Sequence, residues 1–257
     1  MNRQLFFQKI LGKRWFKLSF FGLLLLFIFL IGLIVFIFLK PASPPGRVRV
    51  SNVTENSLTI SWVTEKPVRG QIFFTDQDNK FLRTLKFGLG MIIPQILKPE
   101  SDDFNSPATV HYVTLSGLRP KTEYYYRINY NSRSYKLDQN GEILPSIKTT
   151  ETLAELPSNY PAYGSLLDWN EETPQTPVLV YLSHQDSSLI SGYTNSEGNW
   201  CLNLGNLRTK DLGQAFNFSQ EKMLTFEAEG GALGSIQQAL FIDYCQPMAN
   251  IILEIND

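Results

Sequence analysis

Residues 18–39 form an unbroken apolar run, and this run constrains the fold more than any other feature of the chain. It holds 22 residues without a charge, and nineteen of them are Leu, Ile, Phe or Val. As a helix the run would be roughly 33 Å long, enough to cross a hydrocarbon core of about 30 Å. Its side chains favour insertion by very roughly 6–11 kcal/mol. The sequence therefore predicts a transmembrane helix over 18–39 that contacts the lipid bilayer.

The charges that flank this run predict its orientation. Residues 1–17 carry five basic side chains and no acid, whereas Lys40, Arg47 and Arg49 follow on the other side. Because cytoplasmic flanks carry the excess of Lys and Arg, the N-terminus is expected in the cytoplasm. The sequence thus predicts a single-pass protein of a bacterial cell membrane, with everything from Lys40 onward outside.

A cleaved signal peptide is the alternative to a permanent anchor. The apolar core of a signal peptide is 7–15 residues long and ends at small residues. Here the run is longer, and the small pair that follows it, Ala42-Ser43, has Lys40 two positions before Ala42. The sequence favours an uncleaved anchor, followed by a short, stiff, proline-rich spacer over 40–46.

The outer chain is long enough for two domains, and its charge is divided unevenly. Residues 41–159 hold 14 Lys or Arg and 12 Asp or Glu, whereas residues 160–257 hold 3 and 12. An acidic domain repels phosphate, so a nucleic-acid partner is excluded. The acidic charge is expected to form a solvated surface, although divalent cations or a basic partner are alternatives.

Strand signals dominate the first outer domain, which is expected over 47–150. Apolar residues alternate with Thr59 and Ser61 in the run from Leu58 to Trp62, which indicates a strand with one buried face. Further β-rich runs occupy 48–50, 71–75, 110–115 and 124–128, with turn residues between them. These patterns predict an all-β antiparallel sandwich.

Two segments of this domain carry a resemblance to a known family. VRVSNVTENSLTISWVT (48–64) and HYVTLSGLRPKTEYYYRI (111–128) resemble a fibronectin type III domain of the kind that precedes the catalytic domain of purple acid phosphatases. The resemblance implies a core position for Trp62. It also implies a corner built by Leu118, Pro120 and Tyr124, with the Tyr124 hydroxyl bonded to nearby backbone.

An apolar segment, FGLGMIIPQILKP (87–99), departs from a minimal domain of this type. It lies within 76–109, which is expected to supply an extra strand or to cover one end of the sandwich. The alternative is an interface, because exposed apolar surface usually marks one. The candidate interface residues are Phe87, Leu89, Met91, Ile92 and Ile93.

A linker over 151–159 leads to a second, smaller sandwich over 160–257. Seven strand-like runs are expected, at 164–167, 178–183, 189–194, 200–204, 224–228, 239–242 and 251–255. The pattern from Tyr163 to Arg208, YGSLL…TPVLVYL…SGYTNSEGNWCLNLGNLR, resembles the carboxypeptidase regulatory-like family. That resemblance implies a transthyretin-like fold, a structural role for Trp200 and no active site. The fold class is therefore two tandem antiparallel β-sandwiches after one transmembrane helix.

Cys201 and Cys245 both lie in the acidic domain, and the sequence leaves two alternatives open for their state. An oxidising exterior permits a disulfide, whereas two lone buried thiols are the other reading. Their spacing does not match a metal site.

The sequence offers little chemistry, and no catalytic residue, cofactor, metal site or small-molecule substrate is predicted. His111 shares a strand face with Val113 and Leu115 and is expected to be structural, while His184 is expected to cap a turn near Asp186. Two histidines are too few for a bimetal phosphoesterase. Asn52 begins a glycan-acceptor triplet.

We therefore predict an extracytoplasmic structural or interaction protein with a protein or cell-wall partner. The alternatives are an accessory subunit or truncated relative of an envelope phosphoesterase or peptidase, and a carbohydrate-binding module. The rings that could stack on a sugar are Tyr160, Tyr163, Trp169 and Tyr193, although core packing is favoured for them.

Overall fold

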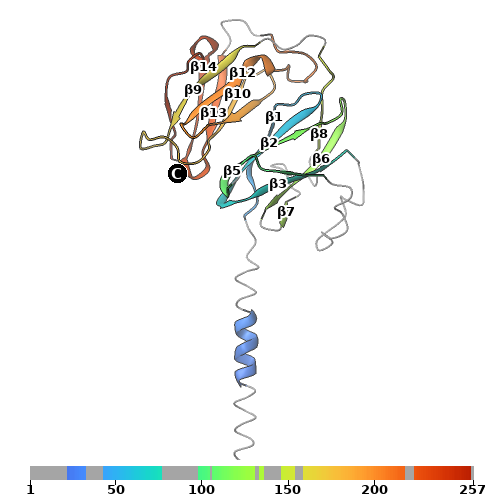
Figure 1. Cartoon of the computed structure of the whole chain (residues 1–257), viewed down its shortest axis with the longest axis vertical. Helices are drawn as coiled ribbons and strands as arrows, with labels where there is room; N and C mark the ends of the chain where they lie inside the picture. Colours follow the sequence, from blue (N-terminus) through green and yellow to red (C-terminus); the bar gives the residue numbers. More distant parts are fainter. Residues whose placement is uncertain are drawn as a thin grey trace, which may run out of the picture. The chain divides into compact units, whose positions relative to one another are not determined.

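The computed structural model describes residues 22–32, 43–76, 98–104, 106–130, 133–135, 146–153, 159–217 and 223–255 (Figure 1). The chain divides into two compact units, Met1–Ala42 and Ser43–Asp257.

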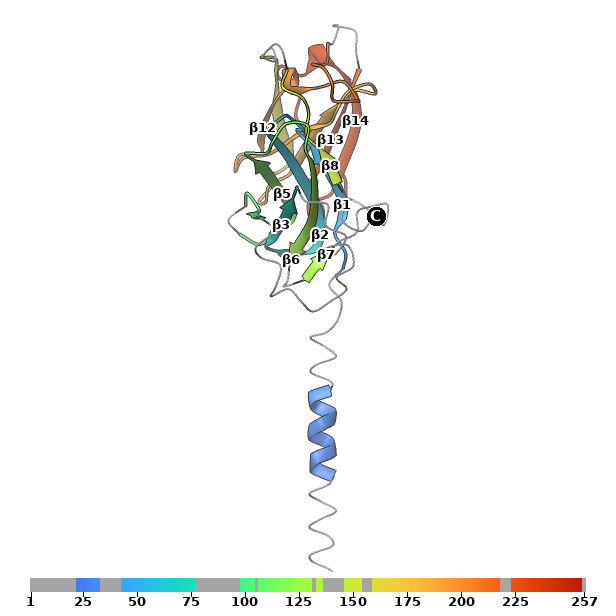
Figure 2. The ribbon, with the colours of Figure 1, turned by 90° about the vertical axis from the view of Figure 1, so that its right-hand side faces the viewer.

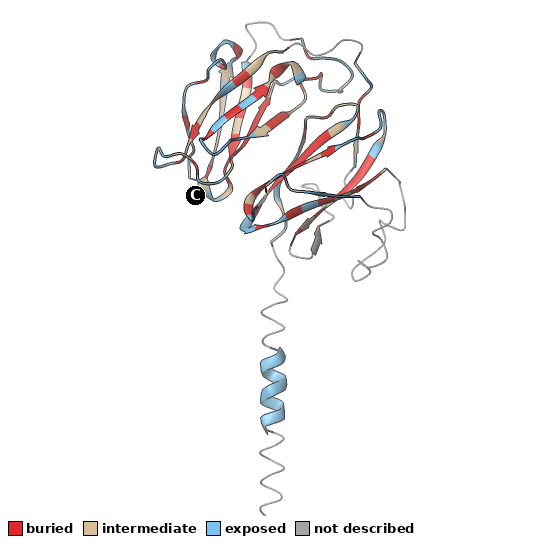
Figure 3. Ribbon diagram, in the orientation of Figure 1, coloured by how far each residue is buried: buried red, intermediate tan, exposed pale blue. Residues whose placement is uncertain are grey.

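In the first unit, residues 22–32 are helical and all of their side chains are exposed (Figure 3). A helix of this length rises about 16 Å, roughly half of a hydrocarbon core. Among the described residues, none of the helices is both long and apolar enough to cross a membrane. The other residues of the predicted span 18–39 lie outside the described part.

The first sandwich of the second unit consists of two antiparallel sheets. One has the order β1-β2-β5, formed by β1 (Gly46–Ser51), β2 (Ser57–Val68) and β5 (Ala108–Ser116). The other has the order β4-β3-β6-β7, with β8 also paired to β6. Its strands are β3 (Gly70–Thr75), β4 (Lys98–Ser101), β6 (Glu123–Tyr130), β7 (Arg133–Tyr135) and β8 (Ser146–Lys148). The expected all-β antiparallel architecture is confirmed here.

The core and the corner of this sandwich follow the sequence pattern. Trp62 and Leu118 are buried, and Pro120 lies exposed in the turn before β6. The backbone N–H of Arg119 donates to the Tyr124 hydroxyl at 2.9 Å, which closes the turn.

Trp62 stacks on His111 with ring centroids 4.8 Å apart, and both side chains are fully buried. Gly70 lies beneath this pair. A Cβ added there would come within 2.4 Å of the Trp62 ring and 2.9 Å of His111 Nδ1, so only glycine leaves room for the stack. His111 is thus a core residue, as the strand pattern predicts.

The second sandwich contains all seven predicted strands. One sheet has the order β11-β10-β13-β14 and the other β12-β9-β15. The strands are β9 (Pro161–Leu167), β10 (Leu179–Ser183), β11 (Ile190–Tyr193), β12 (Asn199–Asn203), β13 (Met223–Glu229), β14 (Ser235–Phe241) and β15 (Ile251–Ile252). Short 3-10 helices are η1 (Leu204–Asn206), η2 (Gly231–Leu233) and η3 (Ile242–Tyr244). Trp200 lies in the core against Phe226.

Two features differ from the sequence prediction. β15 pairs with β9 in the parallel direction, so this sandwich is not purely antiparallel. Thr59 and Ser61 are both buried, whereas alternation along β2 predicted a solvent-facing side for them. The physical reason is a further layer, since the outer face of β1-β2-β5 packs on the outer face of β11-β10-β13-β14 (Figures 1 and 2).

The long segment 76–109 does supply an extra strand, because β4 pairs with the edge of β3. β4 carries Lys98 and Pro99, residues that protect an exposed sheet edge from further pairing. Phe87, Leu89, Met91, Ile92 and Ile93, the candidate interface residues, lie outside the described residues, so the interface remains a prediction.

Candidate functional site

The most elaborate arrangement of buried polar and charged side chains lies at the junction between the two sandwiches. Its apolar centre consists of Val110 and Tyr112 from β5 with Leu179 and Tyr181 from β10, all buried. The ring of Tyr193 packs edge-on against Tyr112, with centroids 5.1 Å apart. The two sheets are thus joined by side chains that interdigitate, as they do between the layers of a single sandwich.

Asn52 occupies a special position at this junction. It follows β1 with φ 51°, a left-handed conformation that asparagine tolerates better than most residues. Its Oδ1 accepts from the backbone N–H of Ser191 at 2.9 Å, and its Nδ2 donates to the Ser191 carbonyl at 3.0 Å. Nδ2 also lies 2.9 Å from the Tyr112 hydroxyl. The side-chain amide therefore pairs with β11 as a neighbouring peptide unit would.

Buried hydroxyl groups extend this network. Ser51 and Ser191 are 2.5 Å apart at their Oγ atoms, and the Ser61 and Tyr181 hydroxyls are 2.8 Å apart. Burial raises the pKa of Tyr112, and it raises the pKa of Tyr181 to about 12. These phenols therefore remain neutral donors near neutral pH, and their hydrogen bonds satisfy groups that would otherwise be buried alone.

Two arginines of β1 pair with two glutamates of β13. Arg47 contacts Glu229 and Arg49 contacts Glu227. The Arg49 guanidinium also lies over the Tyr181 ring, 4.7 Å from its centroid. Burial alone would lower the pKa of Arg49, but the hydrogen bond and charge of Glu227 outweigh burial and raise it. The basic first strand and the acidic second sandwich are therefore complementary at this contact.

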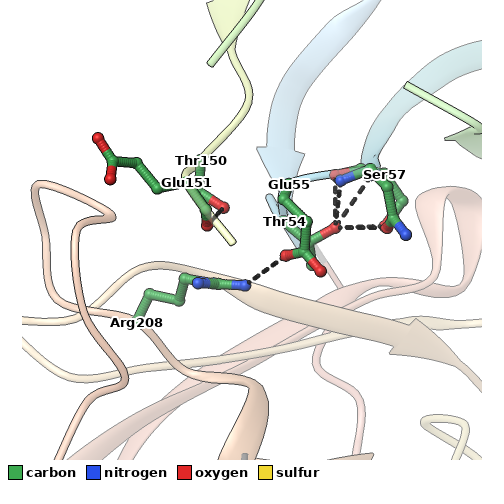
Figure 4. Close-up of polar contacts among 7 residues, drawn as sticks. Thr54, Glu55, Ser57, Thr150, Glu151 and Arg208 are labelled. Atoms are coloured by element: carbon green, nitrogen blue, oxygen red, sulfur yellow. Dashed lines mark hydrogen bonds and ion pairs between the residues drawn. The ribbon is translucent and has the colours of Figure 1, made fainter. Parts of the chain in front are cut away.

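A third ion pair joins the sandwiches with the opposite polarity (Figure 4). Arg208, from the second sandwich, reaches Glu55 in the turn between β1 and β2, with Nη2 and Oε2 3.0 Å apart. The Arg208 side chain is only 6% exposed, whereas the Glu55 side chain is 28% exposed. Solvent screens a buried ion pair less than a surface pair. Loss of Glu55 would therefore leave the charge of Arg208 buried without a partner, which is strongly destabilising.

A separate chain of polar contacts lies inside the first sandwich. His111 Nδ1 is 2.5 Å from an Asp102 carboxylate oxygen, and Nε2 is 3.0 Å from the Thr64 hydroxyl. Thr64 donates its one proton to the Lys66 carbonyl at 2.9 Å. Both ring nitrogens of His111 are therefore engaged in hydrogen bonds within the first sandwich. The arrangement resembles an Asp-His-hydroxyl triad in its components but is fully enclosed, so it is structural.

The junction can hold two domains rigidly, but it is not arranged for chemistry. Its hydroxyl and amide groups are used in pairing the sandwiches, and Asn52 is engaged there rather than displayed as a glycan acceptor. In the described part of the chain, no group of three or more His, Cys, Asp or Glu side chains could hold a metal ion. His184 accepts a hydrogen bond from the Asp186 backbone N–H at 3.1 Å, a turn-capping role.

Cys201 and Cys245 are both free thiols, so the disulfide alternative is not seen, and the alternative of two buried thiols holds for Cys245 but not for the exposed Cys201. Along β12, Trp200 and Leu202 point into the core, so Cys201 points outward by alternation. Cys245 is fully buried in the core of the same sandwich. One thiol is therefore on the surface and the other is enclosed.

The expected core packing of the aromatic rings of the second sandwich is corrected for three of them. Trp169, Tyr163 and Tyr193 are 52%, 41% and 39% exposed. Tyr163 lies on the outer face of β9, and Trp169 follows that strand in a turn. Tyr193 is held edge-on against Phe104 and Tyr112 at the junction, so it is not a free stacking platform.

Comparison with known proteins supports the class of the first sandwich, which is a fibronectin type III-like domain. Residues 45–140 match the family described as Purple acid Phosphatase, N-terminal domain. The match covers β1 to β7 of the first sandwich, ends before β8, and does not extend into the second sandwich.

Solved structures similar to the chain include FN domains of two proteins and the sensor domain of a third. The FN5 domain of Drosophila Lar is 17% identical, with 43% of this chain and 98% of that chain covered and a TM-score of 0.25. The sensor domain of the anti-sigma factor RsgI4 from Pseudobacteroides cellulosolvens is 18% identical, with 43% and 97% covered and a TM-score of 0.27. The chicken CNTN1 FN1-FN3 domains are 12% identical, with 83% and 68% covered and a TM-score of 0.27. At these TM-scores the three structures carry no argument about function.

Proposed function

We propose that this chain is a membrane-anchored protein of the bacterial cell envelope that displays two β-sandwiches, joined as one rigid body, to a protein or cell-wall partner. Two features that occur together in this chain support the proposal. One is an apolar helical segment, 22–32, whose side chains are all exposed, and the other is a unit of two sandwiches held together by an enclosed junction. An exposed apolar helix is unfavourable in water and favourable in a bilayer.

The start of the second unit, at Ser43, is bonded to the first sandwich. The Tyr130 hydroxyl donates to the Ser43 carbonyl, and the Ser43 hydroxyl is 2.5 Å from a Glu65 oxygen. The polypeptide is therefore tied to β6 and β2 immediately after the proline-rich spacer begins.

Protease accessibility in intact cells and spheroplasts tests this proposal. A tag after residue 257 is expected to be digested from outside, while a tag before residue 1 is protected until the membrane is opened. N-terminal sequencing of the mature protein is expected to show that the anchor is retained. A mature chain that begins near Ser43, or a protected C-terminal tag, would contradict anchored display.

The second candidate function is an accessory subunit of an envelope phosphoesterase or peptidase. It is favoured by the match of residues 45–140 to a domain that precedes a catalytic domain. The resemblance of the second sandwich to carboxypeptidase regulatory-like modules supports the same reading. Co-purification with a metallophosphatase or peptidase encoded by a neighbouring frame would favour this candidate over simple display.

A further inference from the structure

β14 is an edge strand that lacks the usual protection against further pairing. It is the last strand in the order β11-β10-β13-β14 and lies along the outer flank of the second sandwich (Figures 1 and 2). Its sequence, SIQQALF, contains no charge and no proline, and its seven pairs with β13 run without a register shift. Exposed edges normally carry charges, prolines or bulges that prevent strand addition.

Other described edges are protected. β4 carries Lys98 and Pro99, and β1 carries Arg47 and Arg49. The edge of β5 is covered by Asp102 and Asp103, which bond the Tyr112 backbone. β12 lies against β11, and β7, β8 and β15 have three residues or fewer. Among the described strands, β14 thus differs in being long, regular and uncovered.

The hydrogen bonds of Ser235, the first residue of β14, show which backbone N–H and C=O groups of this strand point away from β13. Ser235 exchanges hydrogen bonds with Glu254, since its N–H donates to the Glu254 carbonyl at 2.9 Å and its carbonyl accepts from the Glu254 N–H at 3.2 Å. Backbone groups alternate in direction along an antiparallel strand. Those of Gln237 and Ala239 therefore point away from β13. Both residues are exposed, and no backbone partner is seen for these groups within the described part of the chain.

Two exposed carboxylates mark the ends of this free edge. Glu254 lies beside the start of β14, and Asp243 lies in η3 just after its end. Neither forms an ion pair with another described residue. A second copy of the chain paired antiparallel on β14 would place Glu254 of each copy near Asp243 of the other. Like charges oppose that arrangement.

We propose that the edge of β14 binds an extended polypeptide segment of another protein, which is neutral in its middle and basic at both ends. The segment adds one strand along the outer edge of β14, opposite Gln237 to Phe241. This strand continues the line of Glu254, which pairs with Ser235 on the same edge. Its backbone satisfies the outward groups of Gln237 and Ala239, and its terminal Lys or Arg side chains meet Glu254 and Asp243. This proposal rests on the proposed function, because it states the chemistry of the partner that the displayed sandwiches would meet.

A labelled synthetic peptide tests the proposal with the full-length chain in lipid nanodiscs. The probe is acetyl-Lys-Thr-Val-Thr-Val-Thr-Lys-amide, and fluorescence anisotropy reports its binding. Saturable binding is expected, and raising the salt concentration should weaken it. A peptide with Glu in place of both Lys residues, and a peptide N-methylated at alternate amides, are expected to bind at least about tenfold more weakly.

Ala239→Pro is the decisive variant, because it removes an outward N–H and leaves the ladder to β13 intact. It is expected to weaken binding at least about tenfold, whereas the matched control Gln237→Thr keeps the backbone donor and should bind like the wild type. If Ala239→Pro lowers the folded fraction, the double variant Asp243→Asn, Glu254→Gln is used in its place. It should bind the peptide more weakly than the wild type does, and its affinity should no longer depend on the salt concentration.

Several results would overturn the proposal. They are failure of the wild-type chain to bind the probe, equal affinity for the acidic peptide, and unchanged affinity of Ala239→Pro. Dimerisation in mass photometry that Ala239→Pro abolishes would instead assign the edge to a second copy of the chain. The assay does not depend on membrane orientation, so its failure is distinguishable from a failure of the protease-accessibility test.

Discussion

The side-chain amide of Asn52 pairs with both the N–H and the C=O of Ser191, and so joins the end of β1 to β11 across the junction. The backbone N–H of Asn52 adds a hydrogen bond to the Leu189 carbonyl at 3.0 Å. One residue therefore continues the hydrogen bonding of the first sandwich into the second. This contact explains how two domains of opposite charge balance can behave as one unit.

Replacement of Asn52 is expected to destabilise the protein. Asn52→Ala leaves the buried Ser191 backbone without its partner and places alanine at positive φ, so we expect a loss of about 2–4 kcal/mol in unfolding free energy. Asn52→Gly removes the hydrogen bonds without the conformational strain and should cost less. Urea denaturation measures both. Asn250→Ala, at an exposed asparagine, is the control and should change stability by no more than about 0.5 kcal/mol.

The ion pair between Arg208 and Glu55 is expected to contribute more than a surface pair. A double-mutant cycle with Arg208→Ala and Glu55→Ala should give a coupling of about 1–2 kcal/mol, because Arg208 is almost fully buried. The exposed pair Lys121 and Glu151 is the matched control, and a cycle there should give less than about 0.5 kcal/mol. Equal couplings for the two pairs would show that the junction contact is only a surface contact.

Loss of the corner hydroxyl should weaken the first sandwich. Tyr124→Phe deletes the acceptor of the Arg119 N–H, and a cost of about 1 kcal/mol is expected in chemical denaturation. Tyr163→Phe, at a half-exposed ring on the second sandwich, should be neutral. An effect of Tyr124→Phe no larger than that of Tyr163→Phe would contradict the role of the corner.

The two thiols should react at very different rates. Cys201 is exposed, whereas burial, followed by the charge of Asp243, raises the pKa of Cys245 to about 11. Near neutral pH the folded chain is therefore expected to take up one maleimide rapidly, and a second only after denaturation. Mass spectrometry counts the adducts. Failure of both cysteines to react after denaturation without reductant would indicate a disulfide.

Asp103 gives stability a pH dependence of defined sign. Burial, followed by the charges of Asp102 and Glu100, raises the pKa of Asp103 to about 6. The folded state therefore holds its proton between roughly pH 4 and 6, where the unfolded state has lost it, so stability from this group falls as the pH rises through that window. Asp103→Asn should remove that slope. At pH 7 the substitution should stabilise the chain, because it removes a carboxylate that burial and two neighbouring charges disfavour. The gain should be only on the order of 1 kcal/mol, because the group is partly exposed and solvent screens its charge. A steeper slope in the variant would contradict the assignment.

The sequence predicted the individual sandwiches well because alternation and turn residues act locally. All seven strands of the second sandwich and the buried face of the strand that holds Trp62 follow from such local patterns. The hydroxyl contact of Tyr124 was implied by the resemblance to fibronectin type III domains. The all-β class of the outer chain follows from the same signals.

Local patterns could not predict the junction. It depends on which sheet of the first sandwich packs on which sheet of the second, and that choice is made by residues far apart in the sequence. Thr59 and Ser61 have the pattern of a solvent-facing side, and only the packing of a second sheet buries them. Asn52 belonged to a glycan triplet in the sequence, and its pairing with Ser191 spans 139 positions. One signal was available: Arg47 and Arg49 alternate on β1, and Glu227 and Glu229 alternate on β13, so each pair lies on one face of its strand.

A distance distribution across the junction shows whether the two sandwiches form one rigid unit. Cys201 is the exposed native thiol, and Lys148→Cys places a second label site on β8 of the first sandwich. With both sites spin-labelled in the full chain, double electron–electron resonance should give one narrow distance distribution, which Asn52→Ala combined with Glu55→Ala should broaden. A broad distribution in the chain without those two junction substitutions would show that the sandwiches move independently, and would contradict the account of a single rigid unit.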